Sequence, residues 1–488
     1  MNVACFKKSV RFWRITVWLV ALLFGLSGCQ MLQNAGYSPR PGTLRPGLAA
    51  DIGAREHPRV VATYGGIYED GGTERAIAKV VGRLVAVSDD PGLKYRITIL
   101  NSPAVNAFAL PGGYLYVTRG LLALANDTSE LAAVLAHEMA HVTANHAIKR
   151  KQQADQAELV NRVMSNVGKS PEAIEKAIKE TQMQFARFSQ EQELQADDIG
   201  VRTLGAAGYD PYAAARFLKT MGDFARFQSL QGETSQVPDF LSSHPNTPER
   251  VKRAILSARK IGAPGIGRRD KASYLADIDG MLYGDDPLEG FIRGRSFLHK
   301  ALGISFYVPR GYVPENSPDA VLASNGRGTA MRFDGADLSG FEELEDYMRS
   351  GWINGLVDNS VRPATVNGLP AMIGSAVTDG WSFRIGVVRI GATGYRFIFA
   401  SRTPNRRFVD DFERTLHSFK QLSPAEQARL RPLRVKVVYA REGDTASRLA
   451  VGMSGVEAER RLQLFMILNQ VNKATRFHKG DPVKVIVD

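Results

Sequence analysis

The segment from Leu131 to His146, LAAVLAHEMAHVTANH, constrains the fold of this chain more than any other part of the sequence. Its first six residues are apolar on nearly every side of a helix, which predicts a helix packed among other helices. Asp127 and Glu130 have the spacing of a capping box, which indicates where this helix begins. Helical patterns also dominate from about residue 50 to residue 261, so we expect a mainly helical domain around it.

Two histidines in this segment have the spacing of metal ligands. His137 and His141 lie four residues apart, which places them about 40° apart on one face of a helix. Glu138 is the next residue round the helix and can reach a water molecule bound to a shared metal. Imidazole and carboxylate ligands with one open position are typical of catalytic zinc. The pattern predicts one zinc ion per chain; a helix with two hydrogen-bonded histidines is the structural alternative.

No nearby histidine fits as the third ligand. The longer pattern HExxHxxGxxH requires a glycine and a histidine at the positions of Ala144 and Ala147. His146 comes nine residues after His137, on the wrong face of the helix. A carboxylate further along the chain is therefore the alternative.

A second helical pattern, residues 185–204, offers such carboxylates. Glu193 and Asp197 are four residues apart and share one face. One can bind the metal while the other accepts a hydrogen bond from a ligand histidine and fixes its tautomer. Glu191 competes with Glu193 on spacing alone, and a solvated helix face is the structural alternative for any of them.

Several motifs together resemble a known family. HEMAH, followed some fifty residues later by ELQAD, resembles the zinc metallopeptidases that include the CAAX prenyl proteases and HtpX. Four more segments resemble the soluble periplasmic branch of this family, that of the β-barrel assembly-enhancing proteases. These segments are EHPRVVATYGGIY at 56–68, NAFALPGG at 106–113, ARFSQE at 186–191 and HPNTPER at 244–250.

The resemblance covers about residues 50–260 and implies roles for individual residues. It implies that His137, His141 and Glu193 bind the zinc. It implies that Glu138 is the general base and that Asp197 supports a ligand histidine from behind. The domain is then expected to have the mainly helical gluzincin fold with a small β-sheet.

The resemblance also places His244 near the metal. There it can block the fourth ligand position or stabilise a developing oxyanion; a structural histidine before a turn is the plain alternative. The strand at 95–100 and the hairpin at 107–117 are expected to offer an edge beside the cleft. An extended substrate can add to such an edge as a strand, through backbone hydrogen bonds.

The N-terminus has the pattern of an export signal. A basic segment precedes a 12-residue, mostly apolar run, which is too short to span a bilayer. The run leads into Leu26-Ser27-Gly28-Cys29, which resembles a bacterial lipobox and predicts removal of residues 1–28 and lipidation of Cys29. Gln30 follows and, by resemblance to enterobacterial lipoproteins, favours the inner leaflet of the outer membrane. We expect a periplasmic protein on a tether formed by residues 29–49.

The charge of the chain does not make it a nucleic-acid-binding protein. The formal net charge is +12, and four of the positive charges precede residue 29, so +8 remains after removal of that segment. A basic chain can bind nucleic acid. An exported chain meets anionic polymers of the envelope instead, and we expect no nucleic acid among its partners.

The expected secondary structure changes after the peptidase segment. We expect a peptidase domain at 50–262, a Gly-rich, Pro-rich and basic linker at 263–290, and an α+β domain at 291–424. That third segment is faintly similar to PsbP-type domains, and its function is unknown. Residues 434–488 resemble a LysM domain, a βααβ module of which many bind N-acetylglucosamine polymers. The fold class expected for the whole chain is multidomain α+β.

The predicted function is zinc-dependent endopeptidase activity on misfolded or stalled envelope and outer-membrane proteins. The outer-membrane protein assembly machinery and peptidoglycan, through the LysM-like unit, are the other expected partners. The alternative is a chaperone or assembly factor in which His244 keeps proteolysis gated. The intact HExxH favours the enzyme, because a pure binder does not require Glu138. A peptidoglycan amidase, suggested by the last unit, lacks amidase zinc motifs.

Overall fold

The computed structural model describes residues 46–155, 171–229, 244–245, 247–317 and 319–488. The export signal, Cys29 and most of the tether lie outside these residues, so their predictions stay predictions. Helix α2 (Pro46–Thr63) begins within the last four residues of the expected tether. Residues 49–488 form one compact unit. None of the helices in the described part of the chain is long and apolar enough to cross a membrane.

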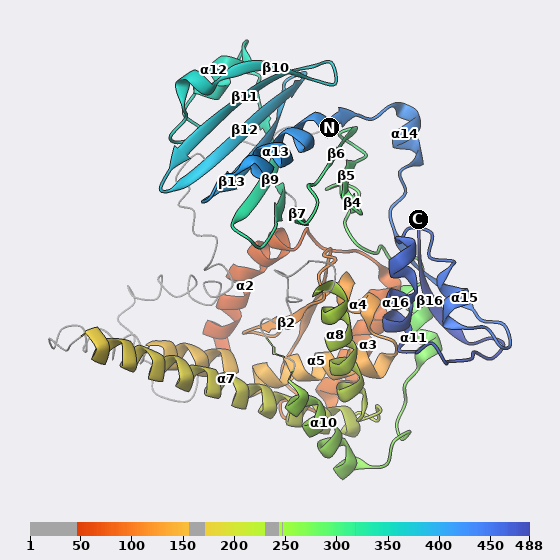
Figure 1. Cartoon of the computed structure of the whole chain (residues 1–488). Coiled ribbons are helices and arrows are strands. Elements are labelled where there is room, and N and C mark those ends of the chain that lie inside the picture. Colours follow the sequence, from red (N-terminus) through yellow and green to blue (C-terminus); the bar gives the residue numbers. More distant parts are fainter. Residues whose placement is uncertain (1–45, 156–170, 230–243, 246, 318) are drawn as a thin grey trace. The chain divides into compact units, whose positions relative to one another are not determined.

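The expected buried helix is α5 (Thr128–Thr143), and every residue from Ser129 to His141 is buried. Helices from before and after it in the chain pack around it (Figure 1). These are α3 (Gly71–Ala86), α7 (Pro171–Ala206), α8 (Ala213–Ser229) and α11 (Lys271–Ile278), with α10 (Pro248–Ile261) packed against α7 and α8. The Asp127 side chain caps α5 by accepting a hydrogen bond from the Glu130 backbone N–H. The prediction of a helix packed among other helices is thus confirmed for α5.

A small sheet lies beside α5. It contains β1 (Arg96–Leu100), β2 (Ala107–Leu110) and β3 (Tyr114–Thr118) in the order β1-β3-β2. Strands β1 and β3 are parallel, and β2 pairs antiparallel with β3, with Ala107 opposite Val117. Strand β2 is therefore an outer strand of the sheet, and it contacts α5.

Residues 291–421 contain mostly strands, as expected for an α+β domain. A seven-stranded antiparallel sheet and a four-stranded sheet enclose a core rich in phenylalanine, with Phe306 and Phe397 in edge-to-face contact. The larger sheet has the order β10-β11-β12-β13-β9-β8-β7. Its strands are β7 (Val313–Ser317), β8 (Ala320–Ser324), β9 (Thr329–Asp337), β10 (Arg362–Val366), β11 (Leu369–Thr378), β12 (Trp381–Ile390) and β13 (Thr393–Ser401).

The smaller sheet has the order β14-β6-β5-β4, and helices complete the domain. Its strands are β4 (Phe291–Arg293), β5 (Ser296–His299), β6 (Ile304–Tyr307) and β14 (Lys420–Gln421), and the helices are α12 (Leu344–Arg349) and α13 (Arg406–Ser418). The acidic sequence FEELEDYMRSG contains α12. Helix α13 packs on β6 and buries Phe408, Phe412 and Leu416 in the core.

The last unit follows helix α14 (Pro424–Arg429) and has the element order strand, helix, helix, strand. Its elements are β15 (Arg434–Tyr439), α15 (Ala446–Ala450), α16 (Ala458–Asn469) and β16 (Pro482–Val487), and the two strands pair antiparallel. This order agrees with the expected βααβ arrangement. The identification as a LysM domain stays a prediction. We call residues 434–488 the C-terminal unit.

Residues 263–290 are more than the expected linker. Their helix α11 buries Tyr274, and the Tyr274 hydroxyl donates to the Leu122 carbonyl at 2.6 Å. Beyond it, Gly280 and Met281 exchange backbone hydrogen bonds with Val435 at 2.8 and 2.9 Å, which extends the sheet of the C-terminal unit. One hydrophobic core therefore joins the helical domain to the C-terminal unit. The glycine and proline at 263–265 favour a linker, and the short apolar pattern that follows them was therefore not recognised as a helix.

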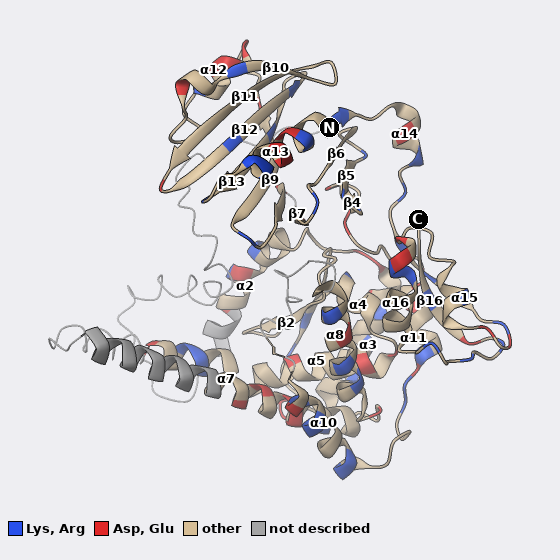
Figure 2. Ribbon diagram, viewed as in Figure 1, with Lys and Arg blue, Asp and Glu red and all other residues tan. Residues whose placement is uncertain are grey.

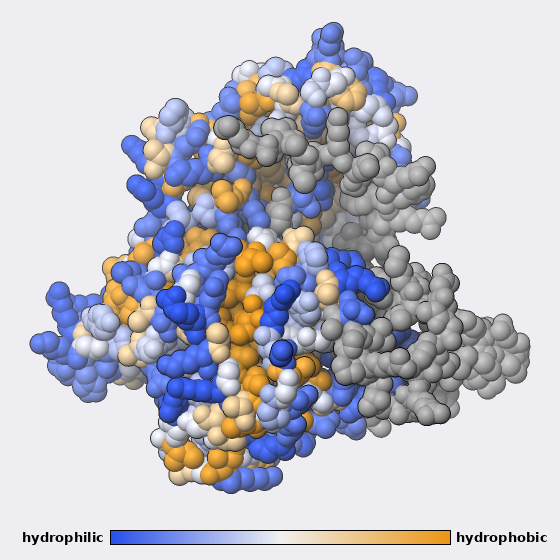
Figure 3. Space-filling model, turned by 180° about the vertical axis from the view of Figure 1, so that it is seen from behind, coloured by the Kyte–Doolittle hydropathy of each residue, from blue (hydrophilic) through white to orange (hydrophobic). Residues whose placement is uncertain are grey.

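Charged residues of both signs are interspersed along most elements in Figure 2. Seen from behind, the surface is largely hydrophilic, and a band of hydrophobic residues runs between hydrophilic ones in the lower half of the view (Figure 3).

Candidate metal centre

Three elements supply the predicted site residues. Helix α5 carries His137 and His141, helix α7 carries Glu193, and His244 lies shortly before α10. Helices α5 and α7 approach closely at Gly200, where a Cβ atom would lie 3.3 Å from the backbone nitrogen of His137. A glycine at this position lets the carboxylate of α7 reach the histidines of α5.

The four side chains converge on one point. One nitrogen or oxygen atom from each of His137, His141, Glu193 and His244 lies within 4.8 Å of all the others, and all four residues are buried. The His137 Nε2 atom is 3.0 Å from His141 Nε2 and 3.3 Å from His244 Nδ1. Glu193 Oε2 is 2.9 Å from His244 Nδ1, and Glu193 Oε1 is 3.4 Å from His141 Nε2. The structure thus brings together the predicted ligands and adds His244.

This donor set fits a zinc ion. Tetrahedral zinc with bonds of about 2.0–2.1 Å to nitrogen and oxygen separates its ligand atoms by roughly 3.3 Å. Five of the six pairs among the four groups have atoms 2.9 to 3.4 Å apart, and all four ligand atoms lie within 4.8 Å of one another. Three imidazole nitrogens facing each other in a buried space are favourable only when a cation or a proton is shared between them. His244 stands at the fourth position, which catalytic zinc sites leave to water.

The Asp197 carboxylate supports the centre from behind. Its Oδ1 atom lies 3.0 Å from His137 Nδ1, the ring nitrogen that faces away from the cluster. Arg250 donates to both Asp197 oxygens at 2.7 and 2.8 Å, and its Nη1 atom lies 3.2 Å from Glu193. The same guanidinium donates to the His244 carbonyl at 3.3 Å. Arg250 of α10 therefore joins α7 to the segment that carries His244, a role that the sequence motif alone did not assign.

His146 has a role that sequence reasoning missed. As expected, it is not a member of the metal cluster. Its Nδ1 atom is 2.9 Å from His141 Nδ1, and its Nε2 atom is 3.1 Å from Gln195 Oε1, so it orients a ligand ring. The interpretation assumed one continuous helix. Asn145 takes a left-handed conformation with φ 55° and turns the chain back; an asparagine just after a helix was the available signal.

Glu138 is buried beside the cluster. Its Oε1 atom lies 3.6 Å from His244 Nε2 and has no hydrogen-bond partner among the described residues. Burial raises the pKa of this carboxyl, and the charges of His244 and His137 partly offset the rise. The competitor Glu191 is exposed to solvent, which excludes it as a ligand in this structure and leaves Glu193 as the carboxylate of the site.

The charges of the site are strongly coupled. Burial lowers the pKa of His137, but Asp197 and Glu193 outweigh it and raise the pKa to about 9. Burial also lowers the pKa of His141, and the neighbouring His137 and His244 lower it further. Burial would raise the pKa of Glu193, but His244 and His137 hold it well below its usual range. One cation, a proton or a metal, is thus favoured between these ligands.

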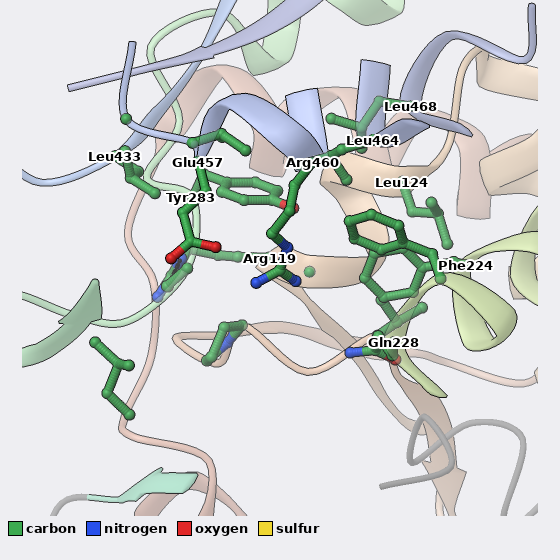
Figure 4. A pocket seen from close by; sticks show the side chains of 18 of the residues that line it. Arg119, Leu124, Phe224, Gln228, Tyr283, Leu433, Glu457, Arg460, Leu464 and Leu468 are labelled. Carbon is green, nitrogen blue, oxygen red and sulfur yellow. Dashed lines mark hydrogen bonds between the residues drawn. The ribbon is translucent and has the colours of Figure 1, made fainter. Parts of the chain in front are cut away.

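The larger of two cavities in the described structure lies away from this site. A cavity of about 270 Å³ lies between α16, α8 and helix α4 (Arg119–Leu124), and Figure 4 shows Arg119, Phe224 and Leu464 around it. A much smaller cavity of about 30 Å³ reaches His137, Asp197 and Arg250. The convergence of buried donor atoms, not the size of a cavity, identifies the centre.

The helical fold and the buried HExxH centre have the features of a metallopeptidase domain. Residues 72–257 match the model of Peptidase family M48. The resemblance expected from the motifs is therefore confirmed.

The chain is similar to β-barrel assembly-enhancing proteases and to the mitochondrial metalloendopeptidase OMA1. The chain is 27% identical over 203 residues to the β-barrel assembly-enhancing protease of Escherichia coli K12, covering 40% of each protein. It is 31% identical over 188 residues to the putative counterpart from Vibrio cholerae, covering 36% of this chain and 37% of the relative. It is 30% identical over 182 residues to the mitochondrial metalloendopeptidase OMA1 of Schizosaccharomyces pombe, covering 36% and 50%. The chain spans half or less of the length of these relatives.

Proposed function

We propose that the protein is a zinc-dependent endopeptidase that cleaves misfolded or stalled envelope proteins, among them outer-membrane proteins. The observation that carries this proposal is the buried cluster of His137, His141 and Glu193, with the buried Glu138 carboxylate beside it, whose Oε1 atom accepts no hydrogen bond from the described residues. Two of the relatives are named β-barrel assembly-enhancing proteases, which supports substrates among outer-membrane β-barrels.

The residues of the site have different roles in peptide hydrolysis. His137, His141 and Glu193 would hold the zinc ion, which supplies Lewis-acid activation when bound. Glu138 accepts the proton of the attacking water and passes it to the leaving amine nitrogen. Asp197 and His146 keep the two ligand rings in fixed orientations and tautomers.

The sheet offers a place for the substrate. Strand β2 is an outer strand and lies against α5, so one side of its backbone faces away from the other strands. An extended polypeptide can pair with that side through backbone hydrogen bonds, which do not depend on its sequence. Such pairing requires an unfolded segment, and this supports unfolded proteins as substrates.

His244 supports a second candidate function. Its Nδ1 atom lies among the ligand atoms, at the position that an attacking water needs. A protein held in this arrangement binds unfolded outer-membrane proteins without cleaving them and acts as a chaperone or assembly factor with gated proteolysis. Proteolysis then requires His244 to leave the cluster.

We also propose a place for the protein in the cell. The export pattern of residues 1–28 and the lipobox cysteine Cys29 support a periplasmic protein anchored to the inner leaflet of the outer membrane. The βααβ order of the C-terminal unit supports peptidoglycan as a further partner. Binding of the full chain to purified peptidoglycan tests the latter directly.

A comparison of substrates tests the proposal. Wild-type protein and the His244→Ala variant, both loaded with zinc, are incubated with an outer-membrane β-barrel protein, either unfolded or refolded in detergent. Cleavage of the unfolded form alone is expected, and it should be faster with His244→Ala. If neither protein cleaves the unfolded form but both suppress its aggregation, the chaperone function replaces the peptidase.

A further inference from the structure

Lys484 of the C-terminal unit reaches into the helical domain. This β16 residue is completely buried. Its Nζ atom donates to the carbonyls of Ala125 at 2.6 Å, Ala123 at 2.7 Å and Leu124 at 3.3 Å. The last carbonyls of a helix have no partner within that helix and attract a cation. Lys484 thus holds the end of α4 and the short connection that leads into α5.

Gln470 of the same unit touches the start of α5 itself. Its Nε2 atom donates to Glu130 Oε1 and to Thr220 Oγ1 of α8, both at 2.7 Å. Glu130 is buried in the first turn of α5, and its other oxygen accepts a hydrogen bond from the Asn126 backbone at 3.0 Å. A side chain 340 positions away therefore contacts the carboxylate that closes the cap of the metal-binding helix.

The surroundings make this contact sensitive. Arg216 of α8 lies 3.3 Å from Glu130 and 3.1 Å from Asp127, the N-cap of α5. In a buried network of this kind, loss of one partner leaves other groups unsatisfied. Next to it, Leu124 of α4 and Leu468 of α16 face the cavity of about 270 Å³ (Figure 4). Apolar contact is incomplete there, so the directional bonds of Lys484 and Gln470 fix the alignment.

We propose that Lys484 and Gln470 are positioning residues for peptide hydrolysis, through which the C-terminal unit fixes the start of the metal-binding helix. The inference rests on the proposed peptidase function. Glu130 and His137 are seven residues apart, which is two helical turns and about 10 Å along α5. A packed helix moves as a rigid body, so a shift at Glu130 displaces Glu138 and the ligand histidines. A displacement of about 1 Å can lower a rate about a hundredfold.

Variants of the full chain test the proposal. Lys484→Met and Gln470→Glu remove the two contacts, and the second places two carboxylates against each other. The exchanged pair Gln470→Glu with Glu130→Gln restores an amide and a carboxylate to the same contact. Lys473→Met, an exposed substitution in the same unit, is the control. With zinc content and KM unchanged, we expect kcat to fall about ten- to hundredfold in the single variants. It should recover in part in the exchanged pair and stay at the wild-type value in the control.

Hydrogen exchange separates this inference from the proposed function. Backbone amides of residues 128–135 should exchange faster in Lys484→Met and Gln470→Glu than in wild type and Lys473→Met. This measurement does not need an active enzyme, so it decides the inference even if the wild type cleaves nothing. Unchanged exchange in α5, with changes confined to residues 434–488, would overturn the proposal. Wild-type kcat in both folded single variants would overturn it as well.

Discussion

At the scale of single residues, each proposed ligand histidine uses its second ring nitrogen for a contact behind the cluster. His137 uses it to contact Asp197, and His141 uses it to contact His146. Helical spacing placed His137 with His141, and Glu193 with Asp197, on shared faces. The choice of Glu193 over Glu191 came from the family resemblance. The role of His146 could not be predicted, since it depends on the reversal at Asn145. The joining role of Arg250 depends on packing between segments 53 positions apart.

His146 offers a direct test at this scale. In His146→Phe the ring keeps its bulk but cannot hydrogen bond to His141, so the ligand loses its fixed orientation. Loss of such a partner lowers metal affinity about 10- to 100-fold. Titration of the metal-free protein with zinc against a chelator measures the change.

A matched control is His57→Phe, because the His57 ring bonds the Tyr116 hydroxyl at 2.9 Å, away from the cluster. This variant should keep the wild-type zinc affinity. Equal zinc affinity in wild type and His146→Phe would show that His146 does not support the centre.

At the scale of elements, the sequence pattern predicted α5 well because its apolar run and its cap indicate the same helix. The strands 96–100 and 107–110 lie within the stretches expected for them, and the strand 114–118 ends one residue beyond the expected hairpin. Helix α11 was missed because its short apolar pattern follows glycines and a proline, which favour a linker in any local interpretation. The close approach of α5 and α7 could not be predicted either, since it depends on a single glycine, Gly200.

Gly200 tests this close approach. In Gly200→Ala the new methyl group would lie 3.3–3.4 Å from the His137 backbone, so α5 and α7 must move apart. We expect a loss of about 1–3 kcal/mol in the free energy of unfolding, as for other overpacked sites. Zinc affinity should fall with it, because Glu193 moves away from the histidines. Denaturant unfolding and zinc titration measure both effects.

Gly82 in α3 is the matched control, because it is exposed and a methyl group there meets no atom within 4 Å. Gly82→Ala should stabilise the protein by about 0.5–1 kcal/mol and leave zinc affinity unchanged. A Gly200→Ala variant that behaves like Gly82→Ala would mean that the helices are not in close contact.

At the scale of the whole molecule, the helical domain, residues 271–283 and the C-terminal unit share one core. The sequence predicted separate domains, because each segment has its own pattern of helices or strands. Their union depends on buried polar contacts such as Lys484 with the end of α4 and Gly280 with Val435. A single lysine in an apolar strand does not by itself predict such a contact.

Glu289 gives the molecule a pH-dependent stability. Burial, with Asp286 and Asp285 nearby, raises the pKa of its carboxyl to about 7. Between the ordinary value of 4.5 and about 7, the folded protein therefore binds more protons at this site than the unfolded chain. This contribution to stability is present below 4.5 and is lost as the pH rises to about 7. Denaturant unfolding at pH 5 and pH 8 measures it.

Glu289→Gln cannot titrate, so its own stability does not depend on this group. From pH 5 to pH 8, the free energy of unfolding of the wild type should therefore fall relative to that of Glu289→Gln. The exposed Glu459→Gln serves as the control, and its difference from wild type should stay constant. The interpretation fails if the Glu289→Gln difference also stays constant across this pH range.

Cleavage of an unfolded polypeptide by wild type and Glu138→Gln tests the central claim most directly. Both proteins are loaded with zinc, and the bound metal is counted before casein or an unfolded outer-membrane protein is added. The His244→Ala background is used in parallel, so that a blocked fourth position cannot hide the activity. We expect one zinc per chain in each protein, cleavage where Glu138 is present, and none with Glu138→Gln. Equal cleavage with and without Glu138, or no cleavage by either zinc-loaded protein that retains Glu138, would contradict a peptidase built on this centre.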